Sequence, residues 1–221
     1  MEGKTANGVK CGTFAASSSE DRHIATGDHA GKLVIYDLEN IDKPIFEQQA
    51  HTSIINAIDG CGGLDTGFGA PEIVTGGRDG CVRLWDQRVE EPVLALEPSE
   101  GQSARDCWTV AFGNSYSDED RCIVAGYDNG DVKLFDLRTN TMRYETNVAN
   151  GVTCIEFDRC VCTLIHSYTH TLIHSYTHTL VHSYTHTLYT IQVLMSSVPS
   201  PPLPPNSYQY GQLLQTPFQL L

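Results

Sequence analysis

The chain has 221 residues, with 27 acidic and 14 basic side chains and a formal net charge of −13 when the histidines are neutral. Acidic and basic residues are interleaved and form no basic run, which argues against a nucleic-acid-binding protein. The eight cysteines include no Cys-x-x-Cys pair, nothing at the N-terminus resembles a secretion signal, and no apolar stretch is long enough for a membrane span. We therefore expect a cytoplasmic protein with reduced thiols and with neither nucleic acid nor membrane as a partner.

Charge divides the chain into two parts. Every charged residue lies at or before Arg159, and residues 160–221 contain none. A boundary this sharp indicates two unrelated segments. We expect residues 1–158 to form a folded domain and residues 159–221 to form a low-complexity, disordered tail.

The first part repeats one pattern three times. Each copy has a short apolar strand, a tight turn that ends in glycine, and a second strand that alternates apolar and polar residues. The copies align without gaps at residues 25–37, 74–86 and 124–136. They lie about 50 residues apart, slightly more than the usual WD-repeat period. An apolar segment precedes each copy, so each repeat has the three or four short strands of a propeller blade.

These repeats predict an all-β fold, a partial WD40 β-propeller. We expect blades at about residues 8–45, 50–95 and 104–145, followed by the first strand of a fourth blade at 152–157. Three blades and a strand cannot close a ring, so apolar blade faces stay uncovered at both ends. We therefore expect a marginally stable or aggregation-prone product.

The second blade holds a set of four polar residues: His51 before its first strand, Thr75 on the second, Asp79 in the turn and Trp85 on the third. Leu84-Trp85-Asp86 resembles the signature of the WD-repeat family. That resemblance implies that the four residues form a structural tetrad of hydrogen bonds, in which Asp79 holds His51 and the chain reaches the indole N–H of Trp85. A charge-assisted hydrogen bond of this kind contributes about 1.5–3 kcal/mol when buried.

The other two blades lack this set. Ala30 and Tyr36 replace the turn aspartate and the tryptophan in the first blade, and Asn129 and Phe135 replace them in the third. We expect these blades to depend more on apolar packing.

Longer stretches resemble one particular group of WD-repeat proteins, the Monad family of dynein axonemal assembly factors. The matching stretches are residues 10–14, 54–60, 69–76, 105–114, 125–138 and 145–147. The resemblance implies a non-enzymatic, cytoplasmic co-chaperone adaptor without a cofactor. Its implied partners are R2TP/prefoldin-like chaperone components and axonemal dynein heavy chains, and the family is also linked to apoptosis. Family members have a seven-bladed ring, whereas the resemblance here ends at Asp158, so we expect truncation to impair the role.

One motif supports an alternative function. Trp85-Asp86-Gln87-Arg88 is echoed by the Asp136 and Arg138 pair at the corresponding place in the third blade. It resembles the box by which some WD-repeat proteins dock to adaptors of cullin-type ubiquitin ligases, which would make the chain a substrate receptor. The simpler interpretation is that Arg88 and Arg138 form local ion pairs at the blade edge, worth about 0–1 kcal/mol.

The sequence offers no catalytic group outside the propeller pattern. His51 and Asp79 could pair in a catalytic site, but no serine in a strained turn accompanies them. The glycine-rich residues 60–69 lack the Gly-Lys-Ser/Thr ending of a phosphate-binding loop. We therefore predict that the chain is not an enzyme.

The tail repeats an octapeptide from Thr163 onward, which is best interpreted as translated tandem-repeat DNA. Its histidines recur every fourth residue, at His166, His170, His174, His178, His182 and His186. On a strand they would share one face, and Thr, Tyr, Ile and Val favour a strand. Weak adventitious metal binding is the alternative, but a simple repeat supplies no enforced geometry, so we predict no defined metal site. The proline-rich residues 198–205 resemble SH3 ligands, and we treat them as disordered filler.

Overall fold

The structure is a computed structural model. It describes residues 7–18, 20–63, 67, 69–98, 103–116, 119, 121–157, 178–184 and 187–195, the last two ranges by their backbone alone. These residues form fifteen strands and no helix. Within those ranges no element therefore meets the length and hydropathy of a membrane-spanning helix.

Three sheets contain four antiparallel strands each, and in each sheet the strands follow chain order from one edge to the other. Blade A consists of β1 (Val9–Thr13), β2 (His23–Asp28), β3 (Lys32–Asp37) and β4 (Asn40–Gln49). Blade B consists of β5 (Ile55–Cys61), β6 (Glu72–Gly77), β7 (Val82–Asp86) and β8 (Leu94–Leu96). Blade C consists of β9 (Cys107–Gly113), β10 (Cys122–Tyr127), β11 (Asp131–Asp136) and β12 (Thr141–Asn147).

The second and third strands of each blade form the hairpin that the repeat predicts. In blade B, Val82 and Leu84 on β7 are buried while Arg83 between them is less so, as expected when successive side chains point to opposite faces. The turn that joins β6 to β7 contains Gly80, whose φ of +79° is a conformation that glycine adopts without strain. This turn fixes the register in which Gly76 pairs with Val82.

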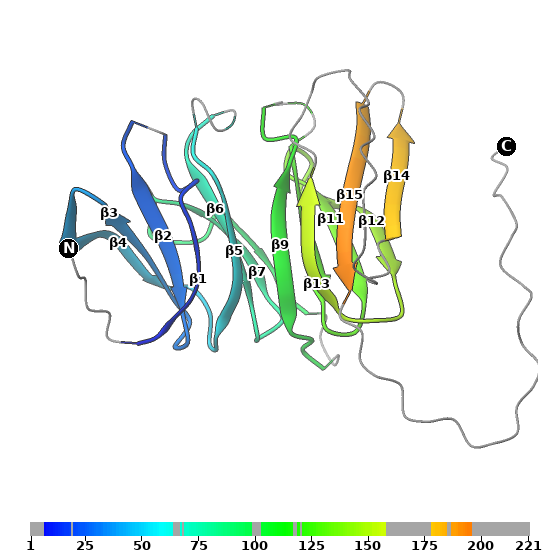
Figure 1. The fold of residues 1–221 in the computed structure, drawn as a ribbon, viewed down its shortest axis with the longest axis horizontal. Coiled ribbons are helices and arrows are strands. Elements are labelled where there is room, and N and C mark those ends of the chain that lie inside the picture. Colours follow the sequence, from blue (N-terminus) through cyan, green and yellow to red (C-terminus); the bar gives the residue numbers. More distant parts are fainter. Residues whose placement is uncertain are drawn as a thin grey trace, which may run out of the picture.

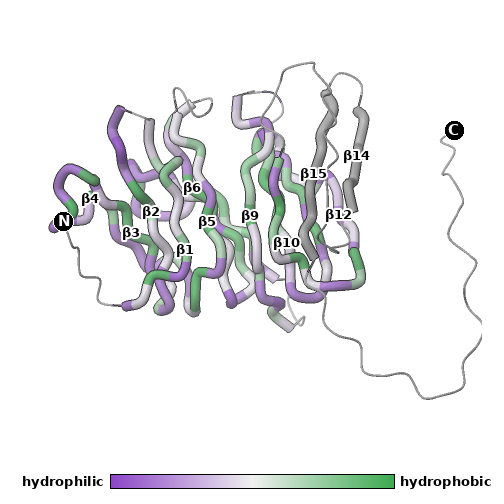
Figure 2. Tube along the Cα trace, viewed as in Figure 1, coloured by the Kyte–Doolittle hydropathy of each residue, from purple (hydrophilic) through white to green (hydrophobic). Residues whose placement is uncertain are grey.

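The blades lie side by side, with their first strands adjacent to one another. Strands β1, β5, β9 and β13 (Val152–Phe157) follow one another across the molecule (Figure 1). The buried apolar residues fall into three clusters. One joins Leu33 and Ile35 of blade A to Ile73 and Trp85 of blade B, and the next two lie at the following blade boundaries. Hydrophobic residues lie along inner strands such as β9 and β10, whereas the outer strand β4 is mostly hydrophilic (Figure 2).

The fourth sheet differs from the expectation of a single strand followed by a disordered tail. Strands β14 (His178–Tyr184) and β15 (Thr187–Met195) join β13, in the order β13-β15-β14. Both segments lie within the stretch for which the sequence predicts a low-complexity tail. Two causes explain the pairing: their residue types favour strands, and the unpaired edge of β13 is a template for pairing.

The order of this sheet also differs from that of a regular blade. β15 lies in the second position, antiparallel to β13, and β14 lies outermost, although it comes first along the chain. Residues 158–177, 185–186 and 196–221, which include the proline-rich stretch, lie outside the described residues.

Candidate functional site

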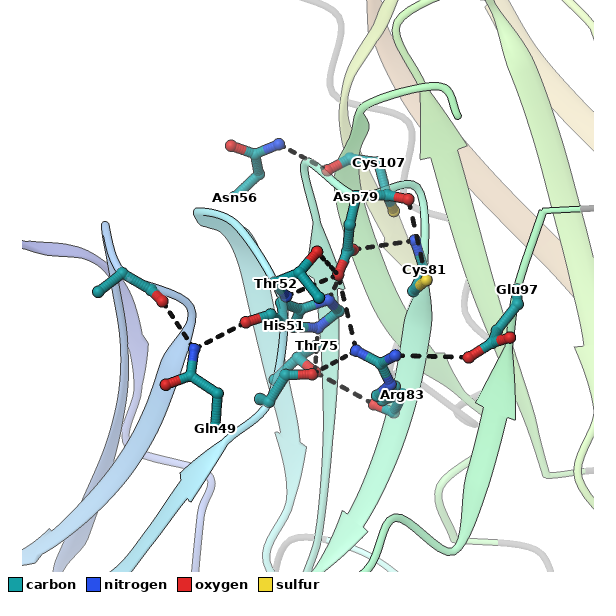
Figure 3. A network of polar contacts seen from close by, with 12 residues as sticks. Gln49, His51, Thr52, Asn56, Thr75, Asp79, Cys81, Arg83, Glu97 and Cys107 are labelled. Atoms are coloured by element: carbon teal, nitrogen blue, oxygen red, sulfur yellow. Dashed lines mark hydrogen bonds and ion pairs between the residues drawn. The ribbon is translucent and has the colours of Figure 1, made fainter. Parts of the chain in front are cut away.

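The four polar residues of blade B form one continuous chain of hydrogen bonds, and Figure 3 shows three of them, His51, Thr75 and Asp79. His51 lies on the connection from β4 to β5, and its Nδ1 is 2.8 Å from Oδ1 of Asp79. Its Nε2 lies 2.9 Å from Oγ1 of Thr75 on β6. The indole Nε1–H of Trp85 on β7 donates to the same hydroxyl oxygen over 3.0 Å. The arrangement is the one that the WD-repeat resemblance implied.

Burial makes this network important for stability. Thr75, His51 and Trp85 are 0%, 1% and 3% exposed. When Nδ1 of His51 carries a proton it donates to Asp79, and Nε2 accepts the hydroxyl proton of Thr75. Each buried polar atom then has a partner, which avoids about 1–3 kcal/mol of desolvation penalty per unpaired group.

Asp79 holds two parts of the site in place, the turn and His51. Its Oδ2 accepts the backbone N–H of Thr52 over 3.0 Å, and its Oδ1 accepts that of Cys81 over 3.2 Å. Burial by itself would raise the pKa of Asp79, but the hydrogen bond and electrostatic attraction from His51, with these two N–H groups, hold the pKa well below its usual value. Asp79 is therefore a carboxylate at neutral pH.

A glycine next to the turn makes the close packing possible. A Cβ atom on Gly77 would lie 2.2 Å from Nδ1 of His51 and 2.5 Å from Oδ1 of Asp79. No side chain fits at that position without displacing the histidine or the carboxylate. The network therefore requires glycine at residue 77.

The network also links blade B to blade A. The backbone N–H of His51 donates to the carbonyl of Gly31 over 2.9 Å. The amide Nε2 of Gln49 donates to the carbonyls of both Ala30 and His51, over 2.7 and 2.8 Å. On the apolar side of the same boundary, the rings of Phe46 and Trp85 meet edge to face with centroids 6.5 Å apart. The site thus joins two blades, and blade B alone would lack these contacts.

Blade C replaces all four residues. Strand register identifies the equivalent of His51: Ile55 pairs with Gly77 at the start of blade B as Cys107 pairs with Tyr127 at the start of blade C. The residue that lies four positions before blade C, as His51 lies before blade B, is therefore the exposed Ser103. The other equivalents of the tetrad in blade C are Ala125, Asn129 and Phe135.

The turns of blades A and C are held by other polar side chains. In blade A, Asp28 accepts the backbone N–H groups of Ala30 and Lys32 over 2.9 and 2.7 Å. In blade C, Asn129 accepts the N–H of Asp131 and donates its own amide to that carboxylate over 2.7 Å. A carboxylate or amide in the turn is therefore common to the three blades, whereas the buried histidine belongs to blade B.

The two Asp-x-Arg pairs differ in their contacts. Nε of Arg88 donates to both carboxylate oxygens of Asp86, over 2.9 and 3.0 Å, and this hydrogen bonding lowers the pKa of Asp86. In blade C the arginine that pairs with Asp136 is Arg143 on β12. Arg138 donates only its backbone N–H to Asp136, over 2.9 Å, and its side chain is exposed. The structure therefore places a local ion pair at Arg88 and a different partner at Asp136.

The buried histidine is not placed for catalysis. His51 is 1% exposed and both of its ring nitrogens have hydrogen-bond partners within the protein. A general base must reach a substrate proton, which this position does not allow. Among the residues with described side chains, no three potential ligands form a metal-binding group. Of the tail histidines, His178 and His182 lie on β14, where only the backbone is described, and the others lie outside the described residues.

Sequence reasoning missed a set of polar contacts between the first strands of neighbouring blades. Asn56 donates to the carbonyl of Cys107 over 3.1 Å, and Asp59 accepts the N–H of Phe112 over 2.8 Å. Thr109 in turn accepts the N–H of Ile155 over 3.2 Å. These side chains satisfy strand edges that have no backbone partner. The sequence did offer a signal, because the polar residues Asn56 and Asp59 interrupt the apolar segment that begins at residue 54.

A thiol makes the corresponding contact between blades A and B. Sγ of Cys11 lies 3.4 Å from the carbonyl of Ile55. Burial raises the pKa of Cys11 to about 11, so the group stays a neutral thiol that can donate. All six cysteines in the described part of the chain are free.

Comparisons with known proteins agree with this architecture. A family model described as WD domain, G-beta repeat matches residues 42–86. This stretch begins within β4 and ends with β7, so the sequence repeat takes its first strand from blade A and the rest from blade B. The crystal structure of the computationally designed Ika4 protein aligns with a TM-score of 0.52 and 18% identity, over 70% of this chain and 82% of that one. That likeness supports the fold alone.

Curated relatives give a more specific match. The chain is 61% identical over 151 residues to dynein axonemal assembly factor 10 of Chlamydomonas reinhardtii, and 57% identical over 152 residues to the Homo sapiens protein of the same name. The Danio rerio protein is 59% identical over 152 residues. The alignments cover 68% of this chain and 42–43% of the relatives, so the chain spans less than half of their length. Over these 151–152 residues the chain is a WD-repeat protein similar to the dynein axonemal assembly factor 10 proteins.

Proposed function

We propose that the chain's blades act as a non-enzymatic protein-binding scaffold in the cytoplasmic assembly of axonemal dyneins. The observation that carries this proposal is the 61% identity to a dynein axonemal assembly factor over 151 residues. Sequence similarity at this level extends well beyond the positions that a WD repeat needs for folding. It therefore supports shared partner-binding surfaces as well as a shared fold.

The proposed partners are R2TP/prefoldin-like chaperone components and dynein heavy chains. An adaptor role fits this fold, because the buried polar groups stabilise the blades and the surface loops are left to bind partners. The acidic surface, with a net charge of −13 over the chain, also suits a protein partner better than a nucleic acid.

A chimera tests this role within the full length of a relative. The 151 matched residues of the Chlamydomonas reinhardtii relative are replaced with those of this chain, in a strain without the native relative. We expect axonemes to regain dynein arms and the cytoplasm to regain heavy chains. We also expect prefoldin-like subunits to co-precipitate with the chimera.

The control is the same chimera with Trp85→Ala, which removes the largest buried side chain of the network. It should accumulate poorly and restore neither dynein arms nor co-precipitation. A folded chimera, present at the native level, that leaves axonemes without dynein arms would contradict the proposal.

A substrate receptor of a cullin-type ubiquitin ligase is the second candidate. It would use Trp85, Asp86 and Arg88, and the 69% exposure of the Arg88 side chain is the observation in its favour. We rank it below the assembly role because Arg88 already donates to both oxygens of Asp86. Recovery of the ligase adaptor with the chimera, lost on Arg88→Ala, would reverse this order.

A further inference from the structure

A groove of about 570 Å³ lies between blades B and C. Three of the four blade C residues at the network positions line it, namely Ser103, Asn129 and Phe135. The fourth, Ala125, is fully buried. The corresponding histidine and tryptophan of blade B are only 1% and 3% exposed, because the network fills this place between blades A and B. The groove therefore lies at the boundary position that the network occupies one blade earlier.

Blade C has lost the groups that close this boundary in blade B. Serine stands in place of the histidine, and phenylalanine stands in place of the tryptophan. Leu94 stands in place of Phe46, whose ring meets the indole between blades A and B. Tyr127 stands in place of Gly77 and brings a ring from blade C that is 8% exposed. The ring of Phe135 consequently remains only partly buried at the groove.

The walls of the groove suit an aromatic ring. Tyr127 and Phe135 contribute rings, and Leu96 and Met142 contribute aliphatic surface. An incoming ring would find here the edge-to-face or offset contacts that aromatic pairs prefer. The fold itself uses such a pair one boundary earlier, where a ring of blade A and a ring of blade B have centroids 6.5 Å apart.

Among the described residues that line the groove, the one charged side chain without a polar partner is positive. The other three already have partners, in the pairs Lys133–Glu145, Glu97–Arg83 and Asp131–Asn147. Arg105 is exposed, and its guanidinium forms no ion pair or hydrogen bond within the described part of the chain. The nearby hydroxyl of Ser103 is likewise free among those residues. An anionic group at this place would therefore meet two side chains that can donate to it.

We propose that the groove lined by Ser103, Arg105 and Phe135 binds an aromatic side chain of a partner protein that has a carboxylate next to it. The ring would pack against Phe135 and Tyr127, and the carboxylate would accept hydrogen bonds from the guanidinium and the hydroxyl. Aromatic side chains in such pockets contribute strongly to affinity between proteins. Nucleic acid also combines rings with negative charge, but the net charge of −13 repels its phosphates. This site goes beyond the dynein-assembly role and does not depend on it.

The test is a titration of the ¹⁵N-labelled full chain, followed by nuclear magnetic resonance. The probe is a blocked dipeptide of tryptophan and glutamate. A blocked dipeptide of tryptophan and lysine is the matched control, and adenosine monophosphate represents nucleic acid.

We expect the acidic dipeptide to shift the amide signals of residues 95–97 and 127–135, which border the groove. Its binding should saturate with a Kd of about 1 mM, as is usual for so small a ligand. The lysine dipeptide should bind about fivefold more weakly, because its charge is repelled by Arg105. The nucleotide should also bind more weakly than the acidic dipeptide.

Substitutions separate the groove from the rest of the chain. Arg105→Glu should weaken binding of the acidic dipeptide by about fivefold and strengthen that of the lysine dipeptide. Arg22→Glu, at an exposed arginine next to β2, should change neither. Ala95→Trp, which adds a ring at the exposed wall of the groove, should weaken both.

The proposal is overturned if the acidic dipeptide causes no saturable shift at the residues that border the groove. Binding of both dipeptides that is unchanged by Arg105→Glu would overturn it as well, and so would tighter binding of the nucleotide than of the acidic dipeptide. The dispersion of the amide signals of each variant checks that a loss of binding does not come from unfolding.

Discussion

Blades B and C have the same four-stranded sheet and achieve it by different means. Blade B buries a histidine, a threonine and a tryptophan in one hydrogen-bonded chain, whereas blade C has a serine, an alanine, an asparagine and a phenylalanine at the equivalent positions. A buried donor or acceptor without a partner would cost more than an apolar core. The comparison teaches that the four-stranded blade forms with the network or without it.

The largest expected effect comes from removing the indole. Trp85→Ala should lower the free energy of unfolding by about 3–5 kcal/mol, because it leaves a cavity against Phe46 and a hydroxyl without its donor. Trp85→Phe, which gives blade B the aromatic ring of blade C, should lower it by about 1 kcal/mol. Urea titration followed by circular dichroism measures both. Equal losses for the two variants would show that packing of the aromatic ring does not contribute to stability here.

Removing the histidine should have the next largest effect. His51→Ala deletes two hydrogen bonds and leaves Thr75 and Asp79 short of partners, so we expect a loss of about 2–3 kcal/mol in the same titration. Ser103→Ala changes the equivalent residue before blade C, which is exposed, and should alter stability by less than about 0.5 kcal/mol. If the two variants matched, the buried network would not distinguish the blades.

A reciprocal exchange of the turn residues tests whether each belongs to its own blade. Asp79→Asn weakens the bond to His51 and should lower the free energy of unfolding by about 1–2 kcal/mol. Asn129→Asp places a carboxylate beside Asp131, to which the amide now donates, and should lower it by about 0.5–1 kcal/mol. A gain in stability from either exchange would contradict the view that the two turns are separately optimised.

Acid should weaken blade B through the same carboxylate. The folded-state pKa of Asp79 lies below its ordinary value, so its contribution is complete above the ordinary aspartate pKa of about 3.9 and is lost as the pH falls below that value. As the pH is lowered from about 5, we expect the free energy of unfolding of the wild-type chain to fall more steeply than that of Asp79→Asn. Urea titrations at steps of about one pH unit measure this difference. Parallel pH profiles for the two proteins would contradict this assignment.

The smallest expected change is a gain, at the connection that leaves blade C. Ala149 has a φ of +66°, a left-handed conformation that strains a residue with a Cβ atom. Ala149→Gly should raise the free energy of unfolding by about 1 kcal/mol. Asn140, with a φ of +53°, is the control, because asparagine tolerates this conformation and Asn140→Gly should change little. A loss of stability in Ala149→Gly would contradict the view that the backbone at Ala149 is strained.

Much of the fold and of the site could be predicted from local sequence. The glycines of the three turns, the alternation on strands such as β7 and the Trp85-Asp86 pair all act over a few residues, so their spacing is visible in the chain. The same pattern named the four members of the network.

By itself, the sequence determined the all-β class, the repeat, the tetrad and the family, since each depends on residue types at fixed spacing. Only the tertiary structure decided how blades meet, as at Asn56 with Cys107 and His51 with Gly31, and that Arg143 takes the place of Arg138 beside Asp136 within blade C. It also decided that β15 pairs with β13. The physical reason is that these contacts join strand edges and side chains far apart in the chain, whose approach depends on how whole sheets pack.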